Sequence, residues 1–394
     1  MNPIDLVDPT LLESLTALRR EIHAHPELGF EVGQTADRVL RRLSALPGLT
    51  IRKNVAEHGI VATLNADRSG RSVALRADMD ALPLTEQTDL PYQSTVAGQM
   101  HACGHDGNTA CLVGAAVVLS RMAGELPGKV KFIFQPAEEG EGGGRVMCEE
   151  GALDDPAVDG AFALHAWPVL TVGQIGVRPG PALAATDTPK ITIRGAGGHG
   201  AHPDKCIDPV VVAAHVVTAL QTVSSRFTDP TDPVVVTISQ IHAGTTHNII
   251  PSEAYLEGTI RTLTPEVRDR TGALVRQIAE QTATAFGATA EVEIEPGYPP
   301  LVNDTGAAEL VAQVANDVVG ADNVILVEPP SMGGEDFAYY AQRVPAAMYR
   351  LGVRPKDADT TPGLHTPQFD FNDDALPIGV AMHCEIARRF LAGG

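Results

Sequence analysis

The spacing of apolar residues in the first part of the chain changes between two periods. Two helices are predicted within residues 10–45, where Leu11, Leu15, Leu18 and Ile22 recur at helical spacing. Short β-rich apolar runs follow at 60–64, 72–76, 129–134 and 161–164, with a helical stretch rich in Ala, Gly, Leu and Val at 108–119. Strands that alternate with helices are typical of an α/β domain. We expect a mostly parallel sheet flanked by helices.

The pattern differs between residues 186 and 297. The predicted elements are a strand at 190–194, a helix at 208–226, strands at 233–240 and 254–262, a helix at 264–286 and a strand at 289–295. The order β-α-β-β-α-β within about 110 residues is that of the ferredoxin-like arrangement. The sequence therefore predicts an inserted α+β satellite domain at 186–297.

The α/β pattern returns after the insert. The predicted elements are a helix at 305–318, a strand at 323–327, a helix at 335–343, a strand at 346–351 and a closing helix from Asp374. The first domain is therefore discontinuous and consists of residues 1–185 and 298–394. A chain of 394 residues is long for one core and suits two domains.

Net charge and cysteine content exclude some classes of protein and indicate a cellular compartment. The chain has 29 basic and 49 acidic residues, a net charge of −20, so no basic face is expected for nucleic acid or an anionic membrane. A spanning helix needs about 18 consecutive apolar residues, and no such run occurs. The N-terminus lacks the basic and apolar regions of a signal peptide. Five scattered cysteines fit a reducing compartment, so we expect a cytoplasmic protein.

Two short stretches carry the candidate chemistry. Cys103 and His105 lie two residues apart on a turn that contains glycine, and Glu138 and Glu139 follow the predicted strand at 129–134. Thiol, imidazole and carboxylate together are the ligand set of a borderline-soft divalent metal. A carboxylate beside a metal-bound water is also what hydrolysis needs as a general base.

Other candidate residues lie at strand ends and in one loop. Asp78 ends a predicted strand, where open α/β sheets build their sites, and it is favoured over the nearby Asp80. His165 follows another predicted strand, and His365 lies in a loop before the final helix. The five candidate ligands are Cys103, His105, Glu139, His165 and His365. Five ligands can hold two ions only if one of them bridges.

Five motifs occur in order along the chain. They are Arg-Ala-Asp-Met-Asp-Ala-Leu-Pro at 76–83, His-Ala-Cys-Gly-His-Asp-Gly at 101–107, Gln-Pro-Ala-Glu-Glu-Gly at 135–140, Gly-Gly-Glu-Asp-Phe at 333–337 and Leu-His at 364–365. With them the chain resembles the M20 metallopeptidase family over nearly its whole length. It is most similar to the amidohydrolase branch, which includes hippurate hydrolases, N-acyl-amino-acid amidohydrolases and plant auxin-conjugate hydrolases.

The resemblance implies two divalent metal ions per subunit, held by the five candidate ligands named above. Zinc and manganese suit the mixed donors, and nickel or cobalt are alternatives. Glu138 is implied as the general base, and Asp78 as a carboxylate that supports the site. The chain departs from the wider family's His-x-Asp at Arg76, and from this branch's usual His-Asp-Gly-His at Asn108.

The resemblance also implies a substrate and an assembly. The substrate is an N-acyl amino acid, whose amide bond is hydrolysed to a carboxylic acid and a free amino acid. His199 is implied to polarise the scissile carbonyl, in its own subunit or in the partner's, and Asn248, Arg261 and Gly334 to bind substrate. A homodimer or higher homo-oligomer is expected through the satellite domain.

Other functions remain open at this stage. The chain could be a dipeptidase or another small-amide hydrolase of the same family. Cys103 could serve as the nucleophile of a metal-independent hydrolase with a histidine base. A metal-dependent binding or dimerisation protein without activity is the third possibility. His23 and His25 lie beside Pro26 and Gly29, which predicts a structural loop there and not a pair of ligands.

Overall fold

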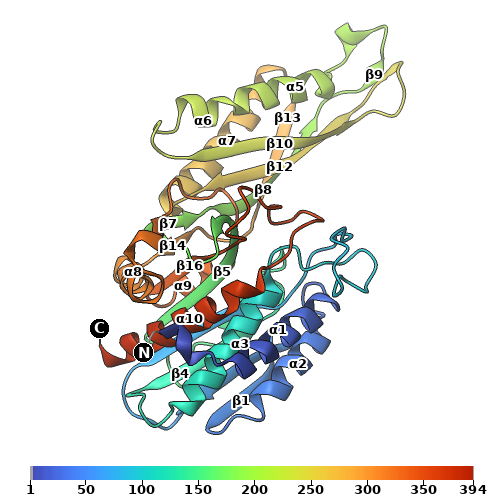
Figure 1. The fold of residues 1–394 in the computed structure, drawn as a ribbon. Helices are drawn as coiled ribbons and strands as arrows, with labels where there is room; N and C mark the ends of the chain where they lie inside the picture. Colours follow the sequence, from blue (N-terminus) through green and yellow to red (C-terminus); the bar gives the residue numbers. More distant parts are fainter. Residues whose placement is uncertain (1–2, 394) are drawn as a thin grey trace. The chain divides into compact units, whose positions relative to one another are not determined.

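The computed structural model describes residues 3–393, which form two compact units (Figure 1). Unit 1 comprises 3–180, 303–329 and 336–393, and unit 2 comprises 181–302 and 330–335. Unit 2 is longer at both ends than the predicted insert. It also includes Pro330–Glu335, which the sequence had assigned to the first domain.

Unit 1 is built on one eight-stranded sheet with the order β1-β2-β4-β3-β5-β16-β6-β15. Its strands are β1 (Leu49–Val55), β2 (Gly59–Leu64), β3 (Ser72–Asp78), β4 (Lys129–Gln135), β5 (Gly160–Thr171), β6 (Ile175–Val177), β15 (Val324–Leu326) and β16 (Ala346–Arg354). Within the central run β4-β3-β5-β16, adjacent strands are parallel, whereas β2 pairs with β4 and β6 with β16 in antiparallel fashion. The expected α/β class with a mostly parallel sheet is confirmed.

Helices of unit 1 pack on one another and on this sheet. They are α1 (Pro9–His23), α2 (Gly33–Leu43), α3 (His105–Arg121), α4 (Gly143–Glu149), α8 (Thr305–Val319), α9 (Ala338–Ala341) and α10 (Leu376–Ala392). The C-terminal helix α10 contacts α3, α8 and strand β3, so both ends of the chain's sequence build one core (Figure 1). Asp8 and Asp304 are the N-cap residues of α1 and α8, because each side chain accepts a hydrogen bond from a backbone N–H of the first turn.

Some predicted elements of unit 1 differ from the structure. The helix expected at 335–343 forms only at 338–341, and strand β5 continues to Thr171 instead of ending near residue 164. Strand β1 was not predicted. It lies at the edge of the sheet, where its polar residues remain exposed, so it lacks the apolar pattern of a buried strand.

Unit 2 contains a four-stranded antiparallel sheet with the order β10-β12-β8-β13. Its elements are β7 (Gly180–Leu183), β8 (Ala185–Arg194), β9 (Gly198–His199), α5 (Pro209–Leu220), α6 (Thr222–Arg226), β10 (Val234–Ala243), β11 (Ile249–Ile250), β12 (Glu253–Thr262), α7 (Pro265–Ala285), β13 (Thr289–Pro296) and β14 (Leu301–Asn303). Helices α5 and α7 pack against the sheet and each other. This strand order and connection make the unit ferredoxin-like, as predicted, although the helix expected at 208–226 is divided at Gln221.

Among residues 3–393, no helix combines the length and the apolar character that crossing a membrane requires.

Candidate metal centre

The site of unit 1 forms where the parallel strands β3 and β4 end, beside the middle of β5, which neighbours β3. Strand β3 ends at Asp78, and β4 leads directly into Glu138 and Glu139. The register pairs Arg76 with Ala163, which places His165 of β5 level with Asp78 although β5 continues further. His165 is therefore within a strand and not at its end, as the sequence had suggested, but it lies where its neighbour β3 stops.

A glycine turn delivers Cys103 and His105 to this place. Gly104 has φ +85°, and a Cβ atom there would lie 2.7 Å from the side chain of Ala166, so only glycine fits. His105 is the first residue of α3. The backbone N–H of His365 donates to the carbonyl of Ala102 at 2.8 Å, which joins the distant loop to the same turn.

The five predicted ligands come together. The Cys103 Sγ lies 3.4 Å from His165 Nε2 and 3.3 Å from His365 Nε2, and His365 Nε2 lies 3.2 Å from Glu139 Oε1. In each of three trios the possible ligand atoms lie within 4.8 Å of one another. The trios are Cys103–His105–His165, Cys103–Glu139–His365 and His105–Glu138–Glu139. Cys103, His105 and Glu139 each belong to two trios, so neighbouring ions could share them.

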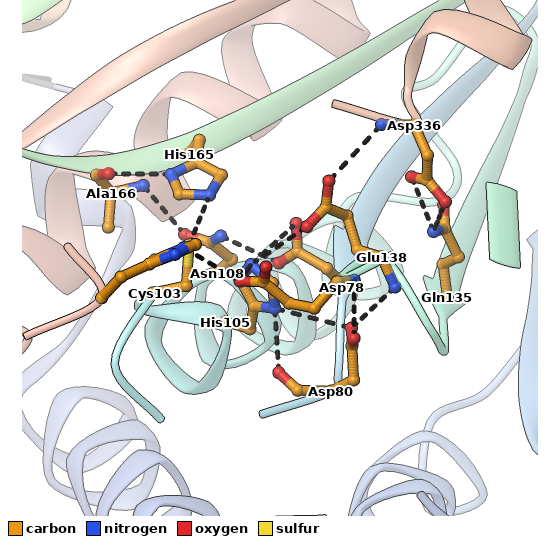
Figure 2. A network of polar contacts seen from close by, with 12 residues as sticks. Asp78, Asp80, Cys103, His105, Asn108, Gln135, Glu138, His165, Ala166 and Asp336 are labelled. Atoms are coloured by element: carbon orange, nitrogen blue, oxygen red, sulfur yellow. Dashed lines mark hydrogen bonds and ion pairs between the residues drawn. The ribbon is translucent and has the colours of Figure 1, made fainter. Parts of the chain in front are cut away.

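Two of the imidazoles are oriented by their outer nitrogens. His105 Nδ1 contacts the Asp80 carbonyl at 2.9 Å, and His165 Nδ1 contacts the Ala166 carbonyl at 2.8 Å (Figure 2). A carbonyl can only accept, so each Nδ1 carries a proton, and each Nε2 is the atom that a metal ion would bind in place of a second proton. Among the described residues, the buried Nε2 of His105 has no hydrogen-bond partner. This donor set fits a divalent metal ion.

Asp80 is a part of the site that the sequence had ranked below Asp78. Its side chain is fully buried, and its two oxygens accept the backbone N–H groups of Glu138 at 3.0 Å and Glu139 at 2.9 Å (Figure 2). Because its carbonyl also orients His105, Asp80 fixes both glutamates relative to the imidazole. The sequence feature that could have indicated a role for Asp80 is its position two residues beyond the end of the buried strand β3.

Asp78 lies deeper, behind His105. Its Oδ2 is 3.8 Å from His105 Nε2 and 2.6 Å from Arg76 Nη1, and its Oδ1 accepts from Asn108 Nδ2 at 2.9 Å. Asn108 also accepts from the Ala166 N–H at 3.2 Å, so it connects β3 with β5. Burial favours the neutral acid, but the charges of His105 and Arg76 outweigh it and hold the pKa of Asp78 well below its usual range.

Electrostatics set the protonation of the other donors. Burial, reinforced by the charges of Glu139 and Glu138, raises the pKa of the Cys103 thiol well above its ordinary value. Reactive cysteines need the opposite environment, one that lowers the pKa. Burial lowers the pKa of His165 to about 4, which keeps this imidazole neutral and able to bind a cation.

The four predicted substrate and carbonyl residues belong to unit 2, in two groups. His199 pairs with Ile249 between β9 and β11, and the Gly200 N–H donates to the Asn248 carbonyl at 2.9 Å, so His199 and Asn248 are neighbours on an exposed loop. A Cβ atom at Gly334 would lie 3.8 Å from Arg261 Nη1, so Gly334 and Arg261 are also neighbours.

A thiol, imidazole and carboxylate cluster on an α/β sheet, in a chain with an inserted ferredoxin-like unit, is typical of a metallopeptidase. The chain belongs to peptidase family M20/M25/M40, which matches residues 74–389.

Individual relatives match nearly the whole chain. The N-acetylcysteine deacetylase of Bacillus subtilis (strain 168) is 37% identical over 386 residues, which cover 97% of this chain and 98% of the relative. The IAA-amino acid hydrolase ILR1-like 4 of Arabidopsis thaliana is 36% identical over 381 residues, which cover 96% of this chain and 86% of the relative. The solved structure of the Bacillus subtilis YxeP protein, described as a dinuclear metal binding peptidase from the M20 family, superposes with a TM-score of 0.86 at 35% identity, covering 98% and 99%.

Proposed function

We propose that this protein is a metal-dependent amidohydrolase that cleaves the amide bond of N-acyl amino acids and releases a carboxylic acid and a free amino acid. The observation that carries the proposal is the convergence of five metal-binding side chains beside one further carboxylate, Glu138. Relatives of similar length that are named as an N-acetylcysteine deacetylase and an IAA-amino acid hydrolase support the substrate class.

Two divalent ions would be held by Cys103, His105, Glu139, His165 and His365. Zinc or manganese suits this mixture of sulfur, nitrogen and oxygen donors, and nickel or cobalt could substitute. When bound, such ions polarise a carbonyl and make water more acidic. Cys103 lies between His165 and His365, which supports it as the shared ligand.

Glu138 is the general base in this proposal. Its side chain is buried, and its Oε2 lies 4.0 Å from His105 Nε2, on the side of the ligand cluster. From this position Glu138 takes a proton from the attacking water and passes it to the leaving amine nitrogen. Asp80 and Asp78 keep His105 and the glutamates in place, so the proton moves between fixed atoms.

Arg261 is proposed to bind the carboxylate of the substrate. Its guanidinium is half-buried, and among the described residues its only hydrogen bond runs from Nε to Thr259 Oγ1 at 2.9 Å. The remaining N–H groups form a planar fork that matches a carboxylate. Gly334 lies beside this fork, and a Cβ atom there would lie 2.5 Å from the Thr186 side chain and 3.8 Å from Arg261 Nη1. Asn248 is proposed as a further substrate contact and His199 as the residue that polarises the carbonyl.

A dipeptidase is the second candidate function, because YxeP is described as a peptidase. Peptide and N-acyl amino acid substrates share the scissile amide and the free carboxylate, so the cluster and Arg261 suit both. A metal-independent Cys103 hydrolase is disfavoured, because burial and neighbouring carboxylates raise the pKa of its thiol.

The test is a substrate panel on protein stripped with a chelator and then reloaded with zinc or manganese. We expect hydrolysis of N-acetyl or N-benzoyl amino acids only after reloading, and little activity on dipeptides with a free amino group. Preference for the dipeptides would favour the second candidate. Activity that survives the chelator, or no activity on any N-acyl amino acid, would overturn the proposal.

We also propose a cytoplasmic homodimer or higher homo-oligomer assembled through unit 2. Strand β10 is an edge strand of its sheet, and its last residues, including Ile241, are exposed. Such an edge offers unpaired backbone groups to a second chain. Light scattering on the purified protein tests this, and a monomer at all concentrations would contradict it.

A further inference from the structure

The carboxylate of Asp336 is fully buried behind Glu138 and saturated with donors. Its Oδ1 accepts from Arg76 Nη2 at 2.7 Å and Gln135 Nε2 at 2.9 Å. Its Oδ2 accepts from Gln135 Nε2 at 2.8 Å and from the Gly144 N–H at 2.6 Å. Gln135 precedes the Glu138–Glu139 pair and Gly144 follows it. Asp336 therefore holds the segment 135–144 by hydrogen bonds at both of its ends.

The backbone of the same residue contacts the proposed base. The Asp336 N–H donates to Glu138 Oε1 at 3.4 Å, while Glu138 Oε2 lies 4.0 Å from His105 Nε2 (Figure 2). One carboxylate oxygen is thus held by a peptide group and the other is directed to the ligand cluster. Residue 336 therefore contributes one contact that orients the Glu138 side chain.

Arg76 supplies the charge that makes this arrangement possible. Its guanidinium is fully buried between Asp78 at 2.6 Å and Asp336 at 2.7 Å, and its Nε donates to Gln135 Oε1 at 2.9 Å. A buried carboxylate needs a paired cation and hydrogen bonds to stay ionised. The planar guanidinium group of arginine has enough N–H donors to bond both carboxylates and the Gln135 side-chain amide at the same time, and a lysine ammonium group lacks this geometry.

We propose that Asp336 and Arg76 form a clamp that positions Glu138, and that they are positioning residues of the reaction. This inference rests on the proposed function of Glu138 as the base. The clamp links residues 76, 135, 144 and 336, which all lie outside the set of five predicted ligands. The clamp is therefore expected to act mainly on proton transfer. Arg76 also contacts Asp78, which lies 3.8 Å from His105 Nε2, so metal content is measured together with kcat.

The first test is Asp336→Asn in the metal-loaded protein. The hydrogen bonds to the carboxylate from Arg76, Gln135 and Gly144 all come from donors, so an amide nitrogen in either position faces a donor and at least one hydrogen bond breaks. We expect kcat to fall at least 10-fold, with KM within twofold of wild type and two metal ions per chain retained. The control is Asp317→Asn, which removes an exposed partner of Arg389 and should leave all three values unchanged. A kcat within twofold of wild type, or a loss of activity that follows loss of metal, would overturn the proposal.

A second test asks whether the effect passes through Glu138. In a Glu138→Gln background, Asp336→Asn should change the residual kcat less than twofold, because the group that it positions is already gone. The same 10-fold loss in both backgrounds would mean a general structural role and would refute the clamp. If Asp336→Asn does not fold, Arg76→Lys replaces it. Lysine keeps the charge but cannot bridge both carboxylates, so the same kcat-selective loss is expected.

Crystal structures provide a readout that does not depend on activity. The clamp predicts one ordered Glu138 side chain in wild type and a displaced or multiple side chain in Asp336→Asn, with His105 unmoved. An unchanged Glu138 in the variant would refute the clamp. If the wild type hydrolyses no N-acyl amino acid, the proposed function fails, and these structures still decide whether residue 336 positions Glu138.

Discussion

The two units carry their candidate residues in different ways. In unit 1, the proposed ligand His105 and the proposed base Glu138 are buried, and each is held by a further contact from Asp80 or Asp336. In unit 2, His199 and Asn248 are exposed on a short two-stranded loop. Buried, cross-connected side chains keep one geometry before any ligand arrives, whereas exposed ones acquire theirs on binding. Chemistry that needs fixed atoms is therefore expected in unit 1, and substrate recognition in unit 2.

The largest effect is expected from the base in unit 1. Glu138→Gln keeps the size of the side chain but removes the proton acceptor, and general base catalysis contributes about 10²–10⁴-fold. We expect kcat to fall in that range with metal content unchanged, measured by steady-state kinetics and metal analysis. Glu141→Gln, an exposed acid in the same segment, is the control and should behave like wild type. Near-normal turnover of Glu138→Gln would assign the base elsewhere.

A second effect concerns the stability of unit 1 and depends on pH. His23 is buried and contacts Asp106 at 2.8 Å and Glu86 at 3.2 Å. Burial lowers its pKa, but the hydrogen bonds and charges of Asp106 and Glu86 prevail and raise the pKa to about 9 from an ordinary value of 6.5. The folded state therefore binds the proton more tightly than the unfolded chain. This stabilisation is complete below pH 6.5 and disappears as the pH rises through 9.

The rise in the pKa of His23 from 6.5 to about 9 gives the size of this contribution to the free energy of unfolding. At about 1.4 kcal/mol per pKa unit it is about 3 kcal/mol. Denaturant unfolding at several pH values should show wild type losing this amount between pH 6.5 and 9, relative to His23→Gln. Parallel stability curves for the two proteins would contradict the proton linkage.

In unit 2 the larger effect is expected at His199. Loss of a group that stabilises a developing oxyanion costs about 10²-fold in kcat. His199→Ala should show this loss, and His202→Ala, which lies on the same exposed turn, should not. Equal and small effects of both substitutions would leave the loop without a role in the chemical step.

The smallest effect is expected at Arg261. Arg261→Lys keeps the charge but loses the planar fork, and a hydrogen bond to a charged group contributes about 1.5–3 kcal/mol. We expect KM to rise about 10-fold for N-acyl amino acids, with little change in kcat. Arg194→Lys, at an exposed ion pair of the same sheet, is the control. If amide substrates without a carboxylate show the same rise, Arg261 does not recognise that group.

Much of the fold could be predicted because apolar periodicity reports local structure. The ferredoxin-like order of unit 2 followed from its alternating strands and its two predicted helices, and most strands of unit 1 followed from short β-rich apolar runs. Strand β1 was missed because an exposed edge needs no apolar pattern, and the place of Pro330–Glu335 in unit 2 depends on contacts between distant segments.

The candidate site was predictable in its residue types more than in its supports. Cys103, His105, Glu138 and Glu139 stand in short motifs next to strand ends, where position in the fold follows from position in the sequence. The roles of Asp80 and Asp336 could not be read in this way. Asp80 accepts from the backbone N–H groups of Glu138 and Glu139, and Asp336 bonds mainly to the side chains of Arg76, Gln135 and Glu138. These partners lie far along the chain, and no local pattern encodes them.

The most direct test of the central claim is a crystal structure of the zinc- or manganese-loaded protein with anomalous diffraction at the metal edge. The account predicts two anomalous peaks in unit 1 within bonding distance of Cys103, His105, Glu139, His165 and His365, with Glu138 beside them and bound to neither ion through the oxygen that Asp336 holds. Peaks elsewhere, or a cluster that binds no ion while the protein is active, would contradict it.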